Sequence, residues 1–153
     1  MTIKLVRSRS LYSGVPYAYA AVAPPGVLVF TAGACPLDDR GDVVGPGDVR
    51  AQASLAVANL VTALAEAGTT LAGVLKTTVY VASADRSDLV AAWDVVSAGF
   101  GPHDAPSTLL GVAVLGYPGQ LVEIEAVAVA AGATAGTDPE GGSTGTSAVT
   151  VSG

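Results

Sequence analysis

Residues 48–100 of the chain read DVRAQASLAVANLVTALAEAGTTLAGVLKTTVYVASADRSDLVAAWDVVSAGF, and this stretch decides the fold class. Apolar residues recur every three or four positions over Asp48–Ala67, which predicts a helix with one apolar face. Gly68 follows it as a glycine of the kind that ends helices. Leu75–Ala82 is rich in β-branched residues and predicts a strand. Asp85–Phe100 carries a second apolar stripe and predicts a second helix.

Short β-rich runs lie on both sides of this helix–strand–helix unit. Strands are expected at Ile3–Arg7, Tyr17–Val22 and Val27–Thr31 before it, and at Ser107–Leu115 and Gln120–Ala130 after it. Helices and strands are mixed without strict alternation, so the sequence predicts an α+β fold rather than a doubly wound sheet. The composition changes after Ala131, and we expect one domain over residues 1–131 followed by a flexible Gly/Ser/Thr-rich tail over 132–153.

Composition and charge narrow the partners. Half of the 153 residues are hydrophobic and 13% are charged, so a monomer would expose apolar area, and we expect a homo-oligomer. The net charge is −6 and no lysine or arginine follows Arg86, which disfavours nucleic acid as a partner. No apolar run is long enough for a membrane span, so no membrane partner is expected. The single cysteine, Cys35, excludes an intrachain disulfide, reads as a small buried hydrophobe and fits a cytoplasmic protein.

The sequence lacks the residues that most cofactor-binding sites and catalytic triads require. There is no Gly-x-Gly-x-x-Gly after a strand and no Walker loop. One histidine and one cysteine cannot build a zinc site, and a serine triad needs a histidine beside its nucleophile. We therefore expect no metal and no cofactor.

The last strand contains the best candidate for a functional side chain. In Leu121–Ala128, Glu123 and Glu125 point to one face and apolar residues to the other. Carboxylates on an otherwise apolar strand are costly unless they are solvated, paired or used. The pattern alone favours a solvated face and leaves a role in acid–base chemistry open.

Four ordered blocks extend this observation. They are Pro16-Tyr17; Val29-Phe30-Thr31-Ala32-Gly33-Ala34-Cys35-Pro36-Leu37; Val74-Leu75-Lys76-Thr77-Thr78-Val79-Tyr80-Val81; and Ala105-Pro106-Ser107-Thr108 with Gly111–Leu115 and Leu121–Ala128. Together they resemble the Rid family, the reactive-intermediate (enamine/imine) deaminases, over about residues 10–130. No single block is specific, but four blocks in order at nearly the family spacing are.

The resemblance implies a chorismate-mutase-like α+β fold, with a mixed sheet packed against two helices. It also implies a homotrimer with a barrel-like core and pockets between subunits. Glu123 would be the pocket glutamate, near which family members hold a water that can attack an imine carbon. Glu125 would have a more structural role, and Tyr17 would line the pocket with its hydroxyl.

The chain also departs from the family pattern. The deaminases carry an arginine just before the Ser-Thr of the closing block, where it binds the substrate carboxylate; here this position is Pro106. Thr31-Ala32-Gly33 replaces a Thr-Ser-Gly and so lacks a hydroxyl. Trp93 stands where a small polar residue is common, and it either packs in the core or an interface or walls a more apolar pocket. We expect weak or absent activity on imines of ordinary 2-amino acids.

His103 is the one group near Pro106 that can become cationic near neutral pH. It is either a solvated loop residue or a pocket residue that replaces the lost charge or acts as an acid–base partner to Glu123. Arg7, Arg9 or Arg50 of another subunit could also supply that charge. With Glu123 as the expected catalytic residue, the expected substrate-binding residues are Tyr17, Thr31, Ala32, Trp93, His103, Pro106, Ser107 and Thr108.

Two functions remain in view, and the balance leans toward an enzyme. The first is a Rid-like enzyme that hydrolyses or tautomerises a small enamine- or imine-type intermediate. The second is a non-catalytic Rid-like protein that binds a small ligand in the same cleft. A pericyclic reaction of the chorismate-mutase type needs several cations around a dicarboxylate, and the seven lysines and arginines of the chain make it improbable.

Overall fold

The computed structural model describes residues 2–132, so nearly all of the predicted 132–153 tail lies outside the described residues. In chain order the elements are β1 (Lys4–Val6), β2 (Ala20–Val22), β3 (Val27–Phe30), α1 (Val49–Glu66), the 3₁₀ turn η1 (Leu71–Gly73), β4 (Val74–Val81), α2 (Arg86–Phe100), β5 (Ser107–Gly111) and β6 (Val122–Ala130). Both predicted helices are confirmed, and each begins after an aspartate cap. Asp48 accepts a hydrogen bond from the Ala51 N–H (3.0 Å) and Asp85 one from the Ser87 N–H (2.9 Å).

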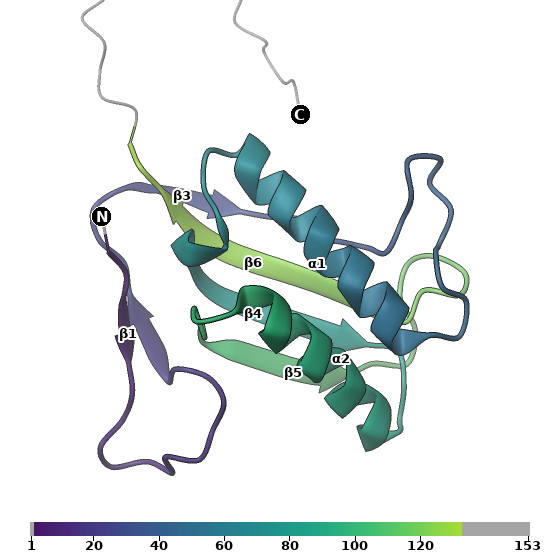
Figure 1. Cartoon of the computed structure of the whole chain (residues 1–153), viewed down its shortest axis with the longest axis horizontal. Coiled ribbons are helices and arrows are strands. Elements are labelled where there is room, and N and C mark those ends of the chain that lie inside the picture. The colour runs from purple at the N-terminus through teal and green to yellow at the C-terminus, as the bar shows by residue number, and fades with distance from the viewer. Residues whose placement is uncertain (1, 133–153) are drawn as a thin grey trace, which may run out of the picture.

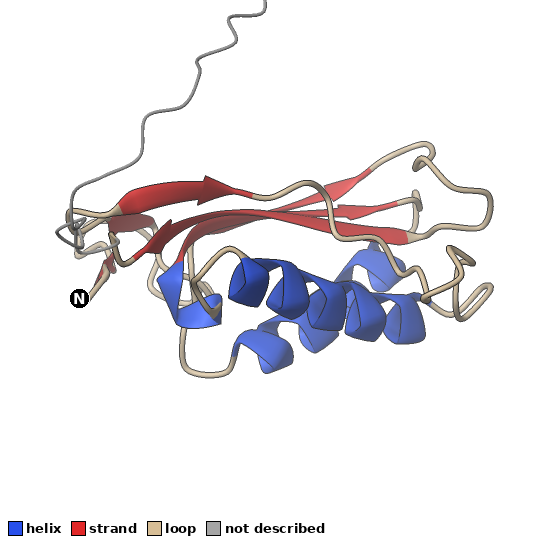
Figure 2. Ribbon diagram, turned by 90° about the horizontal axis from the view of Figure 1, so that it is seen from above, coloured by secondary structure: helices blue, strands red, loops and turns tan. Residues whose placement is uncertain are grey.

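The main sheet has four strands in the order β3-β6-β4-β5. Strands β4 and β5 are parallel and the other pairs are antiparallel, so the sheet is mixed. Both long helices cover one face and leave the other face uncovered (Figure 2). Strands β1 and β2 form a separate two-stranded sheet beside the main one (Figure 1). The α+β fold predicted from the sequence is confirmed.

The core lies between the helices and the sheet. Leu60 and Leu64 of α1 are fully buried there, as are Val79 of β4 and Val122 and Ile124 of β6. The period-2 alternation of β6 sends these apolar side chains toward the helices. It therefore sends Glu123 and Glu125 to the uncovered face.

The uncovered face also carries large apolar groups. Phe30 pairs with Val127 and Leu28 with Val129, so these residues share the face of the two glutamates. Phe30 is 72% exposed and Leu28 is 52% exposed. Such exposure is typical of contact surfaces rather than of solvated sheets.

One predicted strand is too long. The expected strand Ser107–Leu115 ends at Gly111, because β4, the neighbour of β5 in the sheet, itself ends at Val81. The Val112 N–H still donates to the Val81 carbonyl (2.8 Å), and beyond it the chain leaves the sheet. Residues 112–121 form a loop instead.

The fully buried side chain of Gln52 fastens this loop to α1. Its Nε2 donates to the Gly119 carbonyl (2.9 Å), and its Oε1 accepts from the Leu121 N–H (2.7 Å). These bonds fix where the chain re-enters the sheet as β6, just before Glu123. Among the described residues, no helix has the length and apolar character that crossing a membrane requires.

Candidate functional site

The Glu123 carboxylate is held in one orientation on the uncovered face. Glu123 lies opposite Tyr80 in the sheet, and its Oε2 accepts a hydrogen bond from Gln120 Nε2 (3.0 Å). Its other oxygen rests against the backbone of Gly33. A Cβ at Gly33 would overlap that oxygen and lie 2.6 Å from Glu123 Cγ, so the turn after β3 accepts this carboxylate only because residue 33 is glycine.

Gln120 is a buried amide that the sequence analysis missed. Its Nε2 also donates to the Val122 carbonyl (3.2 Å), and its Oε1 accepts from the Tyr117 N–H (3.1 Å). The side chain is thus locked by the loop and can hold Glu123 without moving. A polar residue just before an apolar strand was the available signal, but it does not distinguish a buried amide from a solvated one.

Cys35 lies beside Glu123 and is half-buried rather than fully buried as the sequence suggested. Burial raises the pKa of its thiol, and the charge of the Glu123 carboxylate raises it further. The thiol is therefore protonated at neutral pH and is not poised as a nucleophile. Because the Glu123 charge contributes to the raised pKa of this thiol, the reactivity of Cys35 depends on the position and charge of Glu123.

Glu125 is paired within the sheet. It accepts a hydrogen bond from the Tyr80 hydroxyl (2.8 Å), which raises the pKa of that hydroxyl. The pairing agrees with the structural role expected for Glu125. Thr31 lines a small cavity with Glu125, and its Oγ1 accepts from the Ala126 N–H (2.9 Å), so this hydroxyl pins the turn after β3 against β6. Ala32 is exposed on the same turn.

A second group of candidate residues gathers beyond the edge strand β5. Tyr17, Trp93 and Thr108 line a cavity of about 480 Å³ with Pro16, Ser107 and Leu109, which we call the β5-edge cavity. The rings of Tyr17 and Trp93 meet edge to face, with centroids 6.3 Å apart. The Ser107 hydroxyl is 2.6 Å from that of Thr77, so it is tied to β4.

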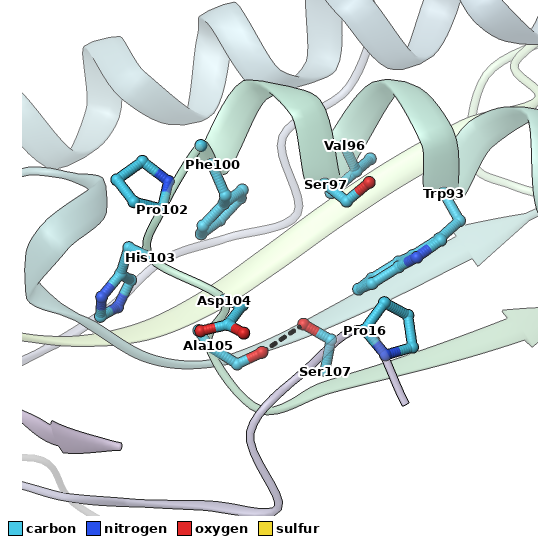
Figure 3. A pocket seen from close by; sticks show the side chains of 11 residues that line it. Pro16, Trp93, Val96, Ser97, Phe100, Pro102, His103, Asp104, Ala105 and Ser107 are labelled. Carbon is cyan, nitrogen blue, oxygen red and sulfur yellow. Dashed lines mark hydrogen bonds between the residues drawn. The ribbon is translucent and has the colours of Figure 1, made fainter. Parts of the chain in front are cut away.

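A neighbouring space of about 280 Å³ lies between α2 and the chain that leads into β5 (Figure 3). We call it the α2 cavity, and it shares Pro16, Trp93 and Ser107 with the β5-edge cavity. His103 lines it, with Nε2 2.7 Å from the Val74 carbonyl, so this ring is anchored rather than freely solvated.

The position of the family arginine carries no charge in the structure either. The Pro106 carbonyl accepts from the Thr77 N–H (3.0 Å), as part of the β4–β5 pairing. Arg7 follows β1 in the same chain, and its guanidinium forms an ion pair with Asp104, a lining residue of the α2 cavity. The charge of Arg7 is thus already neutralised.

The single chain does not bring all the candidate residues together. Tyr17, Trp93, His103, Ser107 and Thr108 lie around the β5 edge and α2, whereas Glu123, Thr31 and Ala32 lie near the turn after β3. Strand β4 separates β5 from β6, so the two groups are divided by a strand of the sheet.

The chain is similar in sequence to known proteins. A family model described as Endoribonuclease L-PSP matches residues 8–130. A RutC family protein of Synechocystis is 35% identical over 131 residues, covering 84% of this chain and 98% of that protein. One from Pyrococcus abyssi is 32% identical over 111 residues, covering 72% of this chain and 84% of that protein.

Solved structures agree. A conserved Rid family protein of unknown function from Yersinia pestis superposes with a TM-score of 0.79 at 30% identity, over 84% of this chain and 99% of that one. A member of the YjgF/YER057c/UK114 family from Mycobacterium tuberculosis has a TM-score of 0.58 at 34% identity, over 84% and 99% of the two chains.

Two helices on one face of a mixed sheet, with a glutamate fixed on the other face, define a small α+β domain of the YjgF type. The family match spans most of the chain, and two curated relatives exceed 30% identity. The chain therefore belongs to the Rid family.

Proposed function

We propose that the protein acts on a small enamine- or imine-type reactive intermediate, by hydrolysis or tautomerisation, at a pocket between subunits. The observation that carries this proposal is the orientation of Glu123. A carboxylate gripped by a buried amide on one side and by a glycine turn on the other is preorganised for chemistry, whereas a merely solvated glutamate needs no such support.

Glu123 would hold a water molecule against the substrate. As the water oxygen attacks the imine carbon, the carboxylate would accept a proton from the water, the C=N electron pair would move to nitrogen, and the carboxyl group would pass that proton to nitrogen to give a carbinolamine. The carboxylate would then take the hydroxyl proton and deliver it to the amine nitrogen as the C–N bond breaks, which leaves a carbonyl and ammonia. In tautomerisation, the same carboxylate would carry a proton between carbon and nitrogen. No cofactor or metal is needed for either route.

A homotrimer would complete the site. The uncovered face exposes Phe30 and Leu28, and burying these against another copy removes apolar area from water. A neighbouring protomer could then bring its Tyr17 and Trp93 toward Glu123. The division of the candidate residues into two groups within one chain supports this arrangement.

Ordinary 2-imino acids are poor candidates as substrates. Pro106 offers no cation for their carboxylate, and the Arg7 guanidinium is paired with Asp104. Losing a charge-assisted contact costs about 1.5–3 kcal/mol. A substrate without a carboxylate avoids this cost.

The alternative is a non-catalytic protein that binds a small ligand in the same pocket. The composition of the β5-edge cavity favours this alternative, because none of the described residues that line it is charged. The name of the matching family model also raises endoribonuclease activity, but a net charge of −6 with no lysine or arginine after Arg86 disfavours RNA.

The proposal is tested by semicarbazide competition. An amino-acid oxidase supplies 2-iminopropionate, which has a carboxylate, and an amine oxidase supplies the imine of benzylamine, which has none and is here called the neutral imine. In each assay the protein competes with semicarbazide for the imine. We expect the neutral imine to be hydrolysed faster and Glu123→Gln to lose this activity. Pro106→Arg should improve 2-iminopropionate turnover.

Fast wild-type hydrolysis of 2-iminopropionate would refute the role given to Pro106, and no turnover of any imine would favour the binding protein. A stable monomer in mass photometry would refute the shared pocket.

A further inference from the structure

We propose that the α2 cavity is a subsite for a compact apolar ring or branched group that bears an amine and not a carboxylate. The assignment of this group to the substrate rests on the proposed function; the binding itself does not.

The cavity has a mixed lining, and its apolar walls come from two directions. Trp93, Val96 and Phe100 project from α2, and Pro16 lies on the opposite side, below Trp93 (Figure 3). A ring placed between them would exchange water for aromatic and aliphatic contact, at a volume of about 280 Å³. These walls suit a small ring better than an extended polar chain.

The hydroxyl groups along the cavity are already used. The Ser107 hydroxyl donates to the Ala105 carbonyl (3.0 Å), and the Ser97 hydroxyl donates to the Asp94 carbonyl (3.3 Å). Neither hydroxyl therefore offers a free donor to an anionic ligand. The polar character of the cavity depends on its two remaining polar side chains, His103 and Asp104.

Both of these side chains offer acceptors. His103 Nε2 faces the Val74 carbonyl, which can only accept, so Nε2 carries a proton, and Nδ1 is an acceptor whenever the ring carries that one proton alone. Asp104 forms an ion pair with Arg7, and a carboxylate can accept more hydrogen bonds than one guanidinium nitrogen donates. Carboxylate oxygens accept only. An amine or ammonium group matches these acceptors, whereas a ligand carboxylate would face Asp104 and would have to compete for Arg7.

The position of the cavity links it to the proposed chemistry. Because Pro16, Trp93 and Ser107 line both cavities, a group seated beneath α2 leaves its attached atoms at the β5 edge. A substrate with its apolar amine-bearing part under α2 would present its reacting carbon in the β5-edge cavity. The lack of a cation at Pro106 and the lining of the α2 cavity thus point to the same preference. Both favour a substrate with an apolar, amine-bearing group and no carboxylate.

The single tryptophan of the chain allows a direct test. Trp93 lines both cavities, so its fluorescence reports binding of probes that do not absorb: cyclohexylamine, cyclohexanol and cyclohexanecarboxylate, which share one ring and differ in charge. We expect the amine to bind most tightly and the carboxylate at least about tenfold more weakly. Equal or tighter binding of the carboxylate overturns the proposal.

Ser97→Leu and its control Thr108→Leu locate the site, and Asp104→Asn tests its selectivity. Ser97→Leu fills the α2 cavity alone and should abolish amine binding, whereas Thr108→Leu fills the β5-edge cavity alone and should retain it. Asp104→Asn should remove the preference for amine over alcohol. Circular dichroism verifies the fold of each variant. Wild-type affinity in Ser97→Leu, or an unchanged preference in Asp104→Asn, contradicts the proposal. Selective amine binding without turnover of any imine would refute the proposed enzyme and leave this subsite standing.

Discussion

Replacing Gly33 by alanine tests the orientation of Glu123 with the smallest available change. The φ angle of Gly33 lies outside the left-handed region, so alanine fits the backbone and the effect comes from the side-chain collision alone. The new Cβ would lie 2.5 Å from Glu123 Cδ, where ordinary contacts begin at 3.4 Å. The carboxylate must therefore move by about 1 Å or more.

That movement breaks the bond from Gln120, which is now 3.0 Å long. A hydrogen bond to a charged group contributes about 1.5–3 kcal/mol, but Glu123 is half-buried and water replaces part of the loss, so we expect a destabilisation of about 1 kcal/mol. Activity should fall much further, because a misplacement of about 1 Å can cost about a hundredfold in rate. The two effects are separable when circular dichroism shows that the variant is folded at 25 °C.

The measurements are urea unfolding followed by circular dichroism, and imine hydrolysis in the semicarbazide assay. Gly116→Ala is the matched control, because a Cβ there meets no atom within 4 Å and its φ is also outside the left-handed region. We expect the control to behave as the wild type in both assays. If Gly33→Ala keeps wild-type turnover, Glu123 does not act from the orientation described, and the reasoning fails.

Three other predictions follow from the same contacts. Glu123→Gln should speed alkylation of Cys35 by iodoacetamide at pH 8, because removing the nearby charge lowers the thiol pKa. The increase in rate should be partial, since burial is the larger cause of the raised pKa and does not change. An unchanged rate would show that the two groups do not interact. The folded-state pKa values of Cys35 and Tyr80 are both raised, so the unfolded chain releases these protons at lower pH than the folded chain. The free energy of unfolding should therefore fall as the pH rises through the alkaline range. In the double variant Cys35→Ala/Tyr80→Phe this fall should be smaller, and a pH profile identical to that of the wild type in urea unfolding would contradict the prediction. Gln52→Leu should lower the free energy of unfolding in urea by about 2–3 kcal/mol, because it leaves the Leu121 N–H and the Gly119 carbonyl without a partner. The control is Thr62→Leu, an exposed change on the same helix, and equal stability of the two variants would contradict the prediction.

The fold was accessible from the sequence because its elements are locally encoded. The apolar periodicity of residues 48–67 and the caps at Asp48 and Asp85 depend on neighbours three or four positions away. The strand Ser107–Leu115 was predicted too long for the opposite reason. Its end depends on where its partner β4 stops, and a partner distant in sequence leaves no local mark.

The candidate site was accessible in part. The alternation of β6 was enough to put Glu123 on the face away from the apolar residues, because side chains alternate in any strand. Gln120, Gly33 and Asp104 were missed, since each matters only through a residue that the fold brings near it. A polar side chain before a strand, a glycine in a turn and an aspartate in a loop are common in any sequence.

By itself, the sequence determined the order of helices and strands, the α+β class and the two faces of β6, all of which follow from residue type and short-range spacing. The loss of charge at Pro106 was also visible in the sequence, but only through the resemblance to the Rid family. Only the tertiary structure decided what touches Glu123, and that β4 divides its surroundings from the cavities lined by Trp93. The physical reason is the strand order β3-β6-β4-β5, which differs from the chain order. Pairing of distant strands is set by packing of the whole core, so the contacts that make a site are fixed only when the chain folds.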